Sequence, residues 1–210
     1  MTDNNSCQHK FEENADTPDI IIARVAVIGC GWWAQGWHLP HLAAHNMPRR
    51  GGRIQIAAVV NLTQNPTSTL TSSPLLSLSE LATKYNCPCY SSVSDMLADE
   101  AVGPTLDGAI IATSHASHYQ VGMSLLREGI SRRQQHYEAY RVMNILMEKP
   151  MTTDVMEARS MWELSTISYP EGEISHISCI DILERCDHNC TILMVFRCIV
   201  SLIRTRGVHH

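Results

Sequence analysis

The fold is decided by residues 23–34, which read Ala23-Arg24-Val25-Ala26-Val27-Ile28-Gly29-Cys30-Gly31-Trp32-Trp33-Ala34. The first six residues form a nearly continuous apolar run, rich in β-branched side chains, of the kind that is buried on both faces of a parallel sheet. After it comes a G-x-G-x-x-A pattern, and a strand before this pattern with a helix after it is typical of a dinucleotide-binding turn. Gly29 permits the tight turn, Gly31 lets the backbone approach a pyrophosphate, and Ala34 keeps helix and strand in close packing. No Lys-Ser or Lys-Thr pair follows the turn, which excludes a phosphate-loop nucleotidase.

Strand and helix signals alternate along the next 130 or so residues. This alternation predicts an α/β fold, a doubly wound and mostly parallel sheet of the Rossmann dinucleotide-binding type. The expected strands are residues 23–28, 53–60, about 89–90, 106–112 and 142–147. The expected helices are residues 32–45, 74–85, a helix capped by Ser92 or Ser94 and ending near Asp99, 117–128 with Gly129 as its stop, and 153–164. Residues 61–79 show little periodicity and are expected to form a long loop.

The chain divides into three parts by composition. Residues 1–22 are polar and acidic and are expected to be a disordered leader, and residues 23–165 are the predicted dinucleotide-binding domain. Residues 166–210 mix cysteines, histidines and apolar residues without a clear period, so no fold is assigned to them. Residues 131–141 form a polar, basic and aromatic insertion that we expect to be a loop at the N-terminal edge of the sheet, away from the cofactor edge.

Composition excludes several classes of partner. The 210-residue chain has a formal net charge of −5 and no long basic run, which argues against nucleic acid and an anionic membrane surface. The longest apolar run, residues 191–203, is too short to span a bilayer and contains Arg197. The acidic start has no apolar signal segment, so the eight cysteines are expected to be reduced thiols of a cytoplasmic protein. The cysteine and histidine spacings, including those of the tail, do not match a zinc site, and no metal is predicted.

Asn61 stands at the end of the second expected strand, where an acidic residue normally accepts the adenosine ribose hydroxyls. A neutral side chain weakens the preference for NAD, because a neutral hydrogen bond contributes about 0.5–1.5 kcal/mol and a charge-assisted one about 1.5–3 kcal/mol. No Lys or Arg occurs between Asn61 and Lys84 to bind the 2′-phosphate of NADP, unless Arg49, Arg50 or Arg53 reaches it. Both NAD and NADP remain open.

Three further landmarks give the chain a family resemblance over residues 23–164. His38-Leu39-Pro40 follows the glycine turn, residues 107–113 read Asp-Gly-Ala-Ile-Ile-Ala-Thr with His118 shortly after, and Glu148-Lys149-Pro150 follows the fifth expected strand. In these features the chain resembles the glucose-fructose oxidoreductase, inositol dehydrogenase and MocA family (Gfo/Idh/MocA), whose NAD(P)-dependent enzymes act on sugars, polyols and related compounds. Family members continue into an α+β substrate domain, and on the resemblance we expect that domain to be missing from this chain.

The resemblance implies roles for several residues. Lys149 corresponds to the family's catalytic lysine beside the nicotinamide and the substrate hydroxyl, while Thr113 and His118 line the same edge. Trp32 and Trp33, with Trp37, are interpreted as packing or lid residues beside the turn. The candidate cofactor-binding residues are Gly29, Gly31, Trp32, Trp33, Ala34, Asn61, Thr113, His118, Glu148 and Lys149.

Three functional readings remain open. The chain is an oxidoreductase acting on a sugar or polyol, a truncated and catalytically inactive dinucleotide-binding module, or a remnant that binds nothing. Calorimetric titration with NADH and NADPH separates the last of these from the other two.

Overall fold

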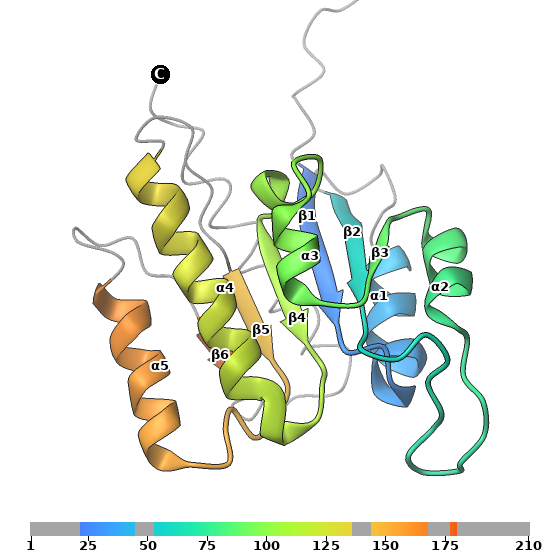
Figure 1. The fold of residues 1–210 in the computed structure, drawn as a ribbon. Helices are drawn as coiled ribbons and strands as arrows, with labels where there is room; N and C mark the ends of the chain where they lie inside the picture. Colours follow the sequence, from blue (N-terminus) through green and yellow to red (C-terminus); the bar gives the residue numbers. More distant parts are fainter. Residues whose placement is uncertain (1–21, 45–52, 136–143, 168–176, 180–210) are drawn as a thin grey trace, which may run out of the picture.

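A computed structural model describes residues 22–44, 53–135, 144–167 and 177–179, and shows a sheet with helices on both faces (Figure 1). The strand order is β3-β2-β1-β4-β5-β6, and every neighbouring pair is parallel. The strands are β1 (Ile22–Ile28), β2 (Arg53–Val60), β3 (Cys89–Tyr90), β4 (Gly108–Ile111), β5 (Asn144–Met147) and β6 (Ile177–Cys179). The predicted α/β fold with a parallel sheet is confirmed.

Helices α3, α4 and α5 cover one face of the sheet, and α1 and α2 cover the other (Figure 1). Their bounds are α1 (Leu39–Ala44), α2 (Leu78–Tyr85), α3 (Val93–Ala98), α4 (His115–Gln135) and α5 (Val155–Ile167), with a 3-10 turn η3 (Gly103–Thr105) before β4. A π-helical turn, η1 (Ala34–His38), leads directly into α1. The sheet therefore separates two apolar cores.

The central strand β1 contributes to both cores, as its apolar sequence predicts. Ala26 and Ile28 pack on the side of α3, α4 and α5, while Val25 and Val27 pack on the side of α1 and α2. These four residues are almost fully buried. Because successive side chains of a strand point to opposite faces, a strand covered on both sides has no position for a polar side chain in its middle.

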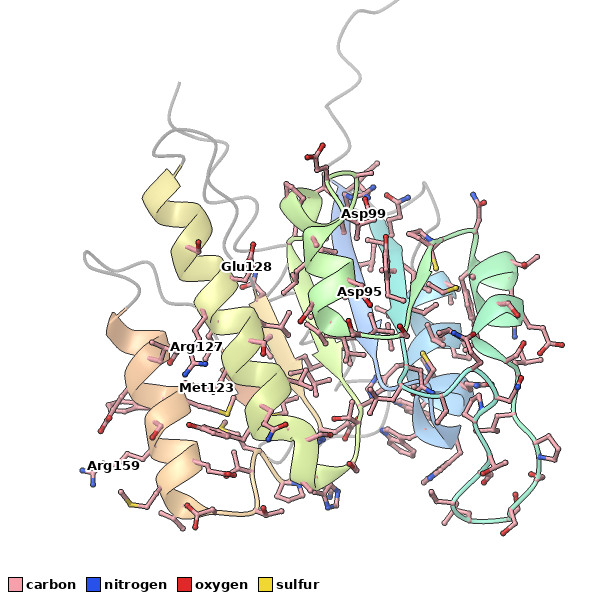
Figure 2. All side chains as sticks on the ribbon, viewed as in Figure 1. Asp95, Asp99, Met123, Arg127, Glu128 and Arg159 are labelled. Carbon is pink, nitrogen blue, oxygen red and sulfur yellow. The ribbon has the colours of Figure 1, made fainter. Side chains whose placement is uncertain are left out.

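Helices α4 and α5 approach each other closely at Gly122. A Cβ atom added there would lie 2.4 Å from Met161 Cε and 2.8 Å from Met147 Cε. Met123 and Arg127 extend from α4 on the side that faces α5, and Arg159 of α5 points away from the fold (Figure 2). The contact between the two helices thus depends on small and flexible side chains at this crossing.

The loop after β2 ends at a capping box. The Ser77 hydroxyl accepts a hydrogen bond from the Glu80 N–H at 3.3 Å, and the Glu80 carboxylate accepts one from the Ser77 N–H at 2.7 Å. These bonds satisfy N–H groups that have no partner within the helix, and so fix the start of α2 at Leu78. The helical signal expected from Pro74 was placed too early, and the expected long loop after Asn61 is present.

Several elements differ from the sequence-based expectations, among them α5, which was expected over residues 153–164 and spans Val155–Ile167. The helix expected to stop at Gly129 continues to Gln135, so the first five residues of the 131–141 insertion are helical and not loop. β4 is shorter than residues 106–112 at both ends. Residues 177–179 form β6 beside β5, inside the tail to which no fold was assigned. The expectations for the leader, for residues 136–141 and for the rest of the tail lie outside the described residues.

No helix among the described residues is both long and apolar enough to cross a membrane. No group of three or more His, Cys, Asp or Glu side chains in the same part of the chain is arranged to hold a metal ion.

Candidate dinucleotide site

The glycine turn is built where the ends of β1, β2 and β4 meet. Gly29 has φ +92°, and its N–H donates to the Val60 carbonyl oxygen at 2.8 Å. A Cβ atom on Gly29 would lie 2.6 Å from the carbonyl carbon of Ala112 and from the backbone nitrogen of Thr113. Both the left-handed backbone and this close approach require glycine, since other residues rarely adopt such a φ.

Gly31 has a different environment from Gly29. Apart from Gly31 itself and its two chain neighbours, no described residue has a heavy atom within 4 Å of the position that a Gly31 Cβ would occupy. The protein itself therefore does not require glycine at this position. Open space beside the backbone is what the approach of a pyrophosphate needs, and the predicted cofactor contact of Gly31 stays a prediction.

Cys30, between the two glycines, is fully buried, and its thiol donates to the Val60 carbonyl oxygen at 3.6 Å. Burial raises the pKa of this thiol to about 12, despite the opposing hydrogen bond to Val60. Cys30 is therefore a packing residue of the turn and not a nucleophile, because the thiolate is the reactive form of cysteine.

Asn61 holds the glycine turn from the end of β2. Its Oδ1 accepts a hydrogen bond from the Cys30 N–H at 3.0 Å. Its Nδ2 donates to the carbonyl oxygen of Thr63 at 2.8 Å and to the Thr63 hydroxyl at 3.0 Å. The structure places Asn61 beside the turn with both ends of its amide engaged by the protein, and its contact with a cofactor stays a prediction.

Gln35 is a residue of this site that the sequence did not single out. Its Nε2 donates to the carbonyl oxygens of Cys30 at 3.0 Å and Leu76 at 2.9 Å, and its Oε1 accepts from the Leu76 N–H at 3.1 Å. One amide thus ties the glycine turn to the loop that precedes α2. The sequence signal for Gln35 was its position one residue after the G-x-G-x-x-A pattern. Its partner Leu76 lies 41 residues away, so the sequence alone did not reveal this contact.

His118 joins the loops that follow β4 and β5. The residue is 0% exposed, its Nδ1 lies 2.8 Å from the carbonyl oxygen of Pro150, and its Nε2 lies 3.1 Å from that of Thr113. Both ring nitrogens thus face protein carbonyl groups. Cofactor contacts of Thr113 and His118 stay predictions, and the geometry gives His118 a supporting place behind the edge of the sheet.

Glu148 links the end of β5 to the helix that follows the glycine turn. Its Oε1 lies 2.5 Å from Trp33 Nε1 and 2.5 Å from His38 Nε2. Burial raises the pKa of Glu148, but the hydrogen bond and charge of His38, the Trp33 indole N–H and the Lys149 backbone N–H outweigh it, and the pKa lies below its ordinary value. The carboxylate is therefore held in its charged form.

Three tryptophans of the helix form a group, and one of them, Trp33, contacts this carboxylate. The rings of Trp33 and Trp37 are stacked with centroids 5.8 Å apart, and Trp32 meets the Trp33 ring edge-on at 5.2 Å. Trp33 is 39% exposed. Ala34 is fully buried against the sheet, which matches the close helix–strand packing predicted for it.

Lys149 is exposed and directly follows Glu148 in the loop that leaves β5. The Glu148 N–H donates to the Ile111 carbonyl oxygen at 2.9 Å, which holds the start of this loop against the end of β4. The Lys149–Pro150 peptide bond is cis. The catalytic role of Lys149 stays a prediction.

The carboxyl ends of parallel strands meet at one edge of a sheet, and the candidate residues gather there. Gly29 follows β1, Asn61 follows β2, Thr113 lies two residues after β4, and Glu148 follows β5. Ligands of open α/β sheets bind outside this edge, where the strand order reverses. In the present sheet the reversal lies between β1 and β4, next to the glycine turn.

A sheet of this order with a glycine turn after its first strand defines a dinucleotide-binding Rossmann domain. The chain belongs to the Gfo/Idh/MocA family of oxidoreductases, whose NAD-binding Rossmann-fold model matches residues 23–166. The family resemblance and the predicted cofactor class, NAD or NADP, are thereby confirmed. No match to the chain was found among curated protein sequences.

Solved structures show the same fold. An NAD-binding oxidoreductase from Klebsiella pneumoniae is 17% identical, with a TM-score of 0.50, over 70% of this chain and 32% of that protein. A WlbA dehydrogenase from Chromobacterium violaceum, crystallised with NADH and UDP-GlcNAcA, is 20% identical, with a TM-score of 0.49, over 73% of this chain and 34% of that protein. The matches thus span about a third of the length of these proteins.

Proposed function

We propose that residues 23–165 form the domain that binds NAD or NADP, with β6 adding a strand to its sheet. We further propose that the protein transfers hydride between the nicotinamide and a sugar or polyol-like substrate. The observation that carries the proposal is the contrast between the two glycines of the turn. Gly29 is required by the protein's own backbone, whereas Gly31 has open space beside it. The protein has room for a side chain at the second glycine, and the absence of one leaves the backbone accessible there. Such a turn is suited to a ligand that approaches the backbone.

Lys149 is the proposed catalytic residue. Bound NAD(P) supplies the hydride acceptor or donor. An exposed ammonium at the carboxyl end of β5 can hydrogen-bond the substrate oxygen and stabilise alkoxide character there as the carbon–hydrogen bond breaks. The family match supports this assignment, because the Glu148-Lys149-Pro150 motif lies within the matched residues.

Binding is tested by calorimetric titration of the purified chain with NADH and with NADPH. We expect saturable binding of at least one of them by the wild type and a loss of at least about tenfold in affinity for Gly31→Val. Gly36→Ala is the matched control, because Gly36 lies on the same helical segment and also has open space at its Cβ position. Equal binding by wild type and Gly31→Val would contradict the proposed site.

Turnover is tested separately with a panel of sugars and polyols and both oxidised cofactors. Hydride transfer predicts reduction of the cofactor by the wild type and its loss in Lys149→Ala, with cofactor affinity retained. A chain that binds NADH but oxidises no member of the panel would favour the second candidate, a dinucleotide-binding module without turnover.

The proposed compartment is the cytoplasm. Cys30, Cys87 and Cys89 are free thiols, which is usual for a reducing compartment. Cell fractionation with an antibody against the chain tests this assignment.

A further inference from the structure

Trp33 and His38 contact the same oxygen atom although they are five residues apart. In an α-helix with 3.6 residues per turn, side chains five residues apart point about 140° away from each other around the axis. The turn between these residues is π-helical, and the Leu39 N–H bonds to the Ala34 carbonyl oxygen, five residues earlier. This wider turn brings the two side chains to the same side of the helix.

The local sequence favours the wider turn. Pro40 has no N–H to donate, and in a regular helix its ring would clash with the carbonyl group four residues earlier, that of Gly36. The π-turn ends two residues before Pro40, at His38. Single π-turns are rare and occur frequently at functional sites.

The carboxylate of Glu148 bridges two segments that are distant in the sequence. The side chains of His38 and Glu148 are only 6% and 14% exposed, so water screens their interaction little. The Glu148 N–H is in turn bonded to Ile111 at the end of β4. The helix after the glycine turn is thus connected through one carboxylate to the loop that carries Lys149.

We propose that Glu148 is a positioning residue which, held by Trp33 and His38 across the π-turn, orders the nicotinamide half of the dinucleotide site. The inference rests on the proposed function. The adenosine half of a dinucleotide lies on the side of β2, where Asn61 stands, and the nicotinamide half lies toward β4 and β5. Glu148 follows β5, and its Oε1 is occupied by two protein donors, so it acts through the segments that it joins.

The test compares two ligands, NADH and ADP-ribose, which share the adenosine and the pyrophosphate and differ in the nicotinamide. Affinities are measured by calorimetry for the wild type and for Glu148→Ala, Glu148→Gln and Glu163→Ala. We expect Glu148→Ala to lower the affinity for NADH about tenfold and to leave that for ADP-ribose within about twofold of wild type. The amide oxygen of Glu148→Gln still accepts hydrogen bonds, so this variant should recover part of the loss.

Two further variants make the result specific. Glu163→Ala removes an exposed carboxylate of α5, whose partner is Arg159, and should change neither affinity. Trp33→Phe keeps an aromatic ring but removes the indole N–H, and should lower NADH affinity about threefold without affecting ADP-ribose. Trp33→Phe also provides the test if Glu148→Ala does not fold.

The outcomes separate the possibilities. Equal losses for NADH and ADP-ribose, together with a lower melting temperature, would show that Glu148 only supports the fold and would overturn the inference. An unchanged NADH affinity in both Glu148→Ala and Trp33→Phe would also overturn it, with the proposed function intact. A wild-type chain that binds neither ligand would remove the proposed function and, with it, this inference.

Discussion

The side-chain oxygen of Asn61 accepts a hydrogen bond from the backbone N–H of Cys30, so the residue that ends β2 also fixes the glycine turn after β1. An aspartate at this position could make the same bond through one oxygen. Its other oxygen could not donate to the Thr63 carbonyl oxygen, which Asn61 Nδ2 binds at 2.8 Å, and would turn away from it to offer its charge to the ribose of a bound dinucleotide. The neutral amide therefore maintains the turn while leaving the adenosine side of the site without a carboxylate.

Asn61→Asp should shift the cofactor preference toward NADH. A charge-assisted hydrogen bond exceeds a neutral one by about 1 kcal/mol, which predicts roughly fivefold tighter NADH binding. NADPH should bind more weakly by a similar factor, because a carboxylate repels the 2′-phosphate. Calorimetric titration of both cofactors measures the two changes, and unchanged NADPH affinity would contradict the placement of Asn61 beside the adenosine ribose.

Gly29→Ala should destabilise the protein even without a ligand. The φ of +92° is unfavourable for alanine, and the new Cβ would meet backbone atoms of Ala112 and Thr113 at 2.6 Å. Left-handed strain costs about 1–2 kcal/mol and overpacking about 1–3 kcal/mol, so we expect a loss of about 2–5 kcal/mol in the free energy of unfolding. Urea unfolding measures it. Gly36→Ala is the control, since its Cβ position is open.

His118→Ala should also destabilise the fold, since it removes a fully buried ring and the hydrogen bond that a ring N–H donates to the carbonyl oxygen of Thr113 or of Pro150. A buried group that loses its partner costs about 1–3 kcal/mol, and we expect about 2–4 kcal/mol in all. His115→Ala, on the exposed side of the same helical turn, should have little effect. Thermal unfolding compares the two variants, and similar melting temperatures would contradict the supporting place given to His118.

The stability that Glu148 contributes should depend on pH. Its pKa is lowered on folding, so this contribution is complete above the unfolded-state pKa of about 4.3 and is lost as the pH falls through the lower folded value. The side chain that faces this carboxylate is that of His38. Between pH 5 and pH 3 the wild type should therefore lose its advantage over Glu148→Gln in urea unfolding. An advantage that stays constant down to pH 3 would show that the carboxylate charge contributes nothing.

The sheet and the glycine turn could be predicted because their signals are local. The apolar run of β1 and the spacing of Gly29, Gly31 and Ala34 each depend on contiguous residues, and both are present as expected. The end of α4 could not be predicted from Gly129 alone. Glycine stops a helix when it adopts a positive φ, and among the described residues Gly29 is the one glycine that does so. With an ordinary φ, Gly129 costs a helix only about 1 kcal/mol, and α4 continues past it.

The contacts that organise the candidate site are not local. His38 and Glu148 are 110 residues apart, and Gln35 and Leu76 are 41 apart, so no spacing rule connects them. The π-turn was missed for a related reason. The expected helix over residues 32–45 was regular, whereas the observed helix contains a wider turn beside Pro40, and its Trp33 bonds to the carboxylate of Glu148, which follows β5. Sequence reasoning identified the residues at the edge of the sheet but not the bonds between them.

Because Cys30 is buried in the glycine turn, the reactivity of its thiol reports whether the turn is open or closed. A thiol with a pKa near 12, covered by the ends of β1 and β2, is inert to alkylating reagents while the turn is closed. Once the turn opens, the same thiol reacts at the rate of an ordinary cysteine. Pulsed alkylation followed by mass spectrometry of the peptide containing Cys30 would therefore follow local opening of the turn without any engineered probe, and a bound dinucleotide should slow the labelling.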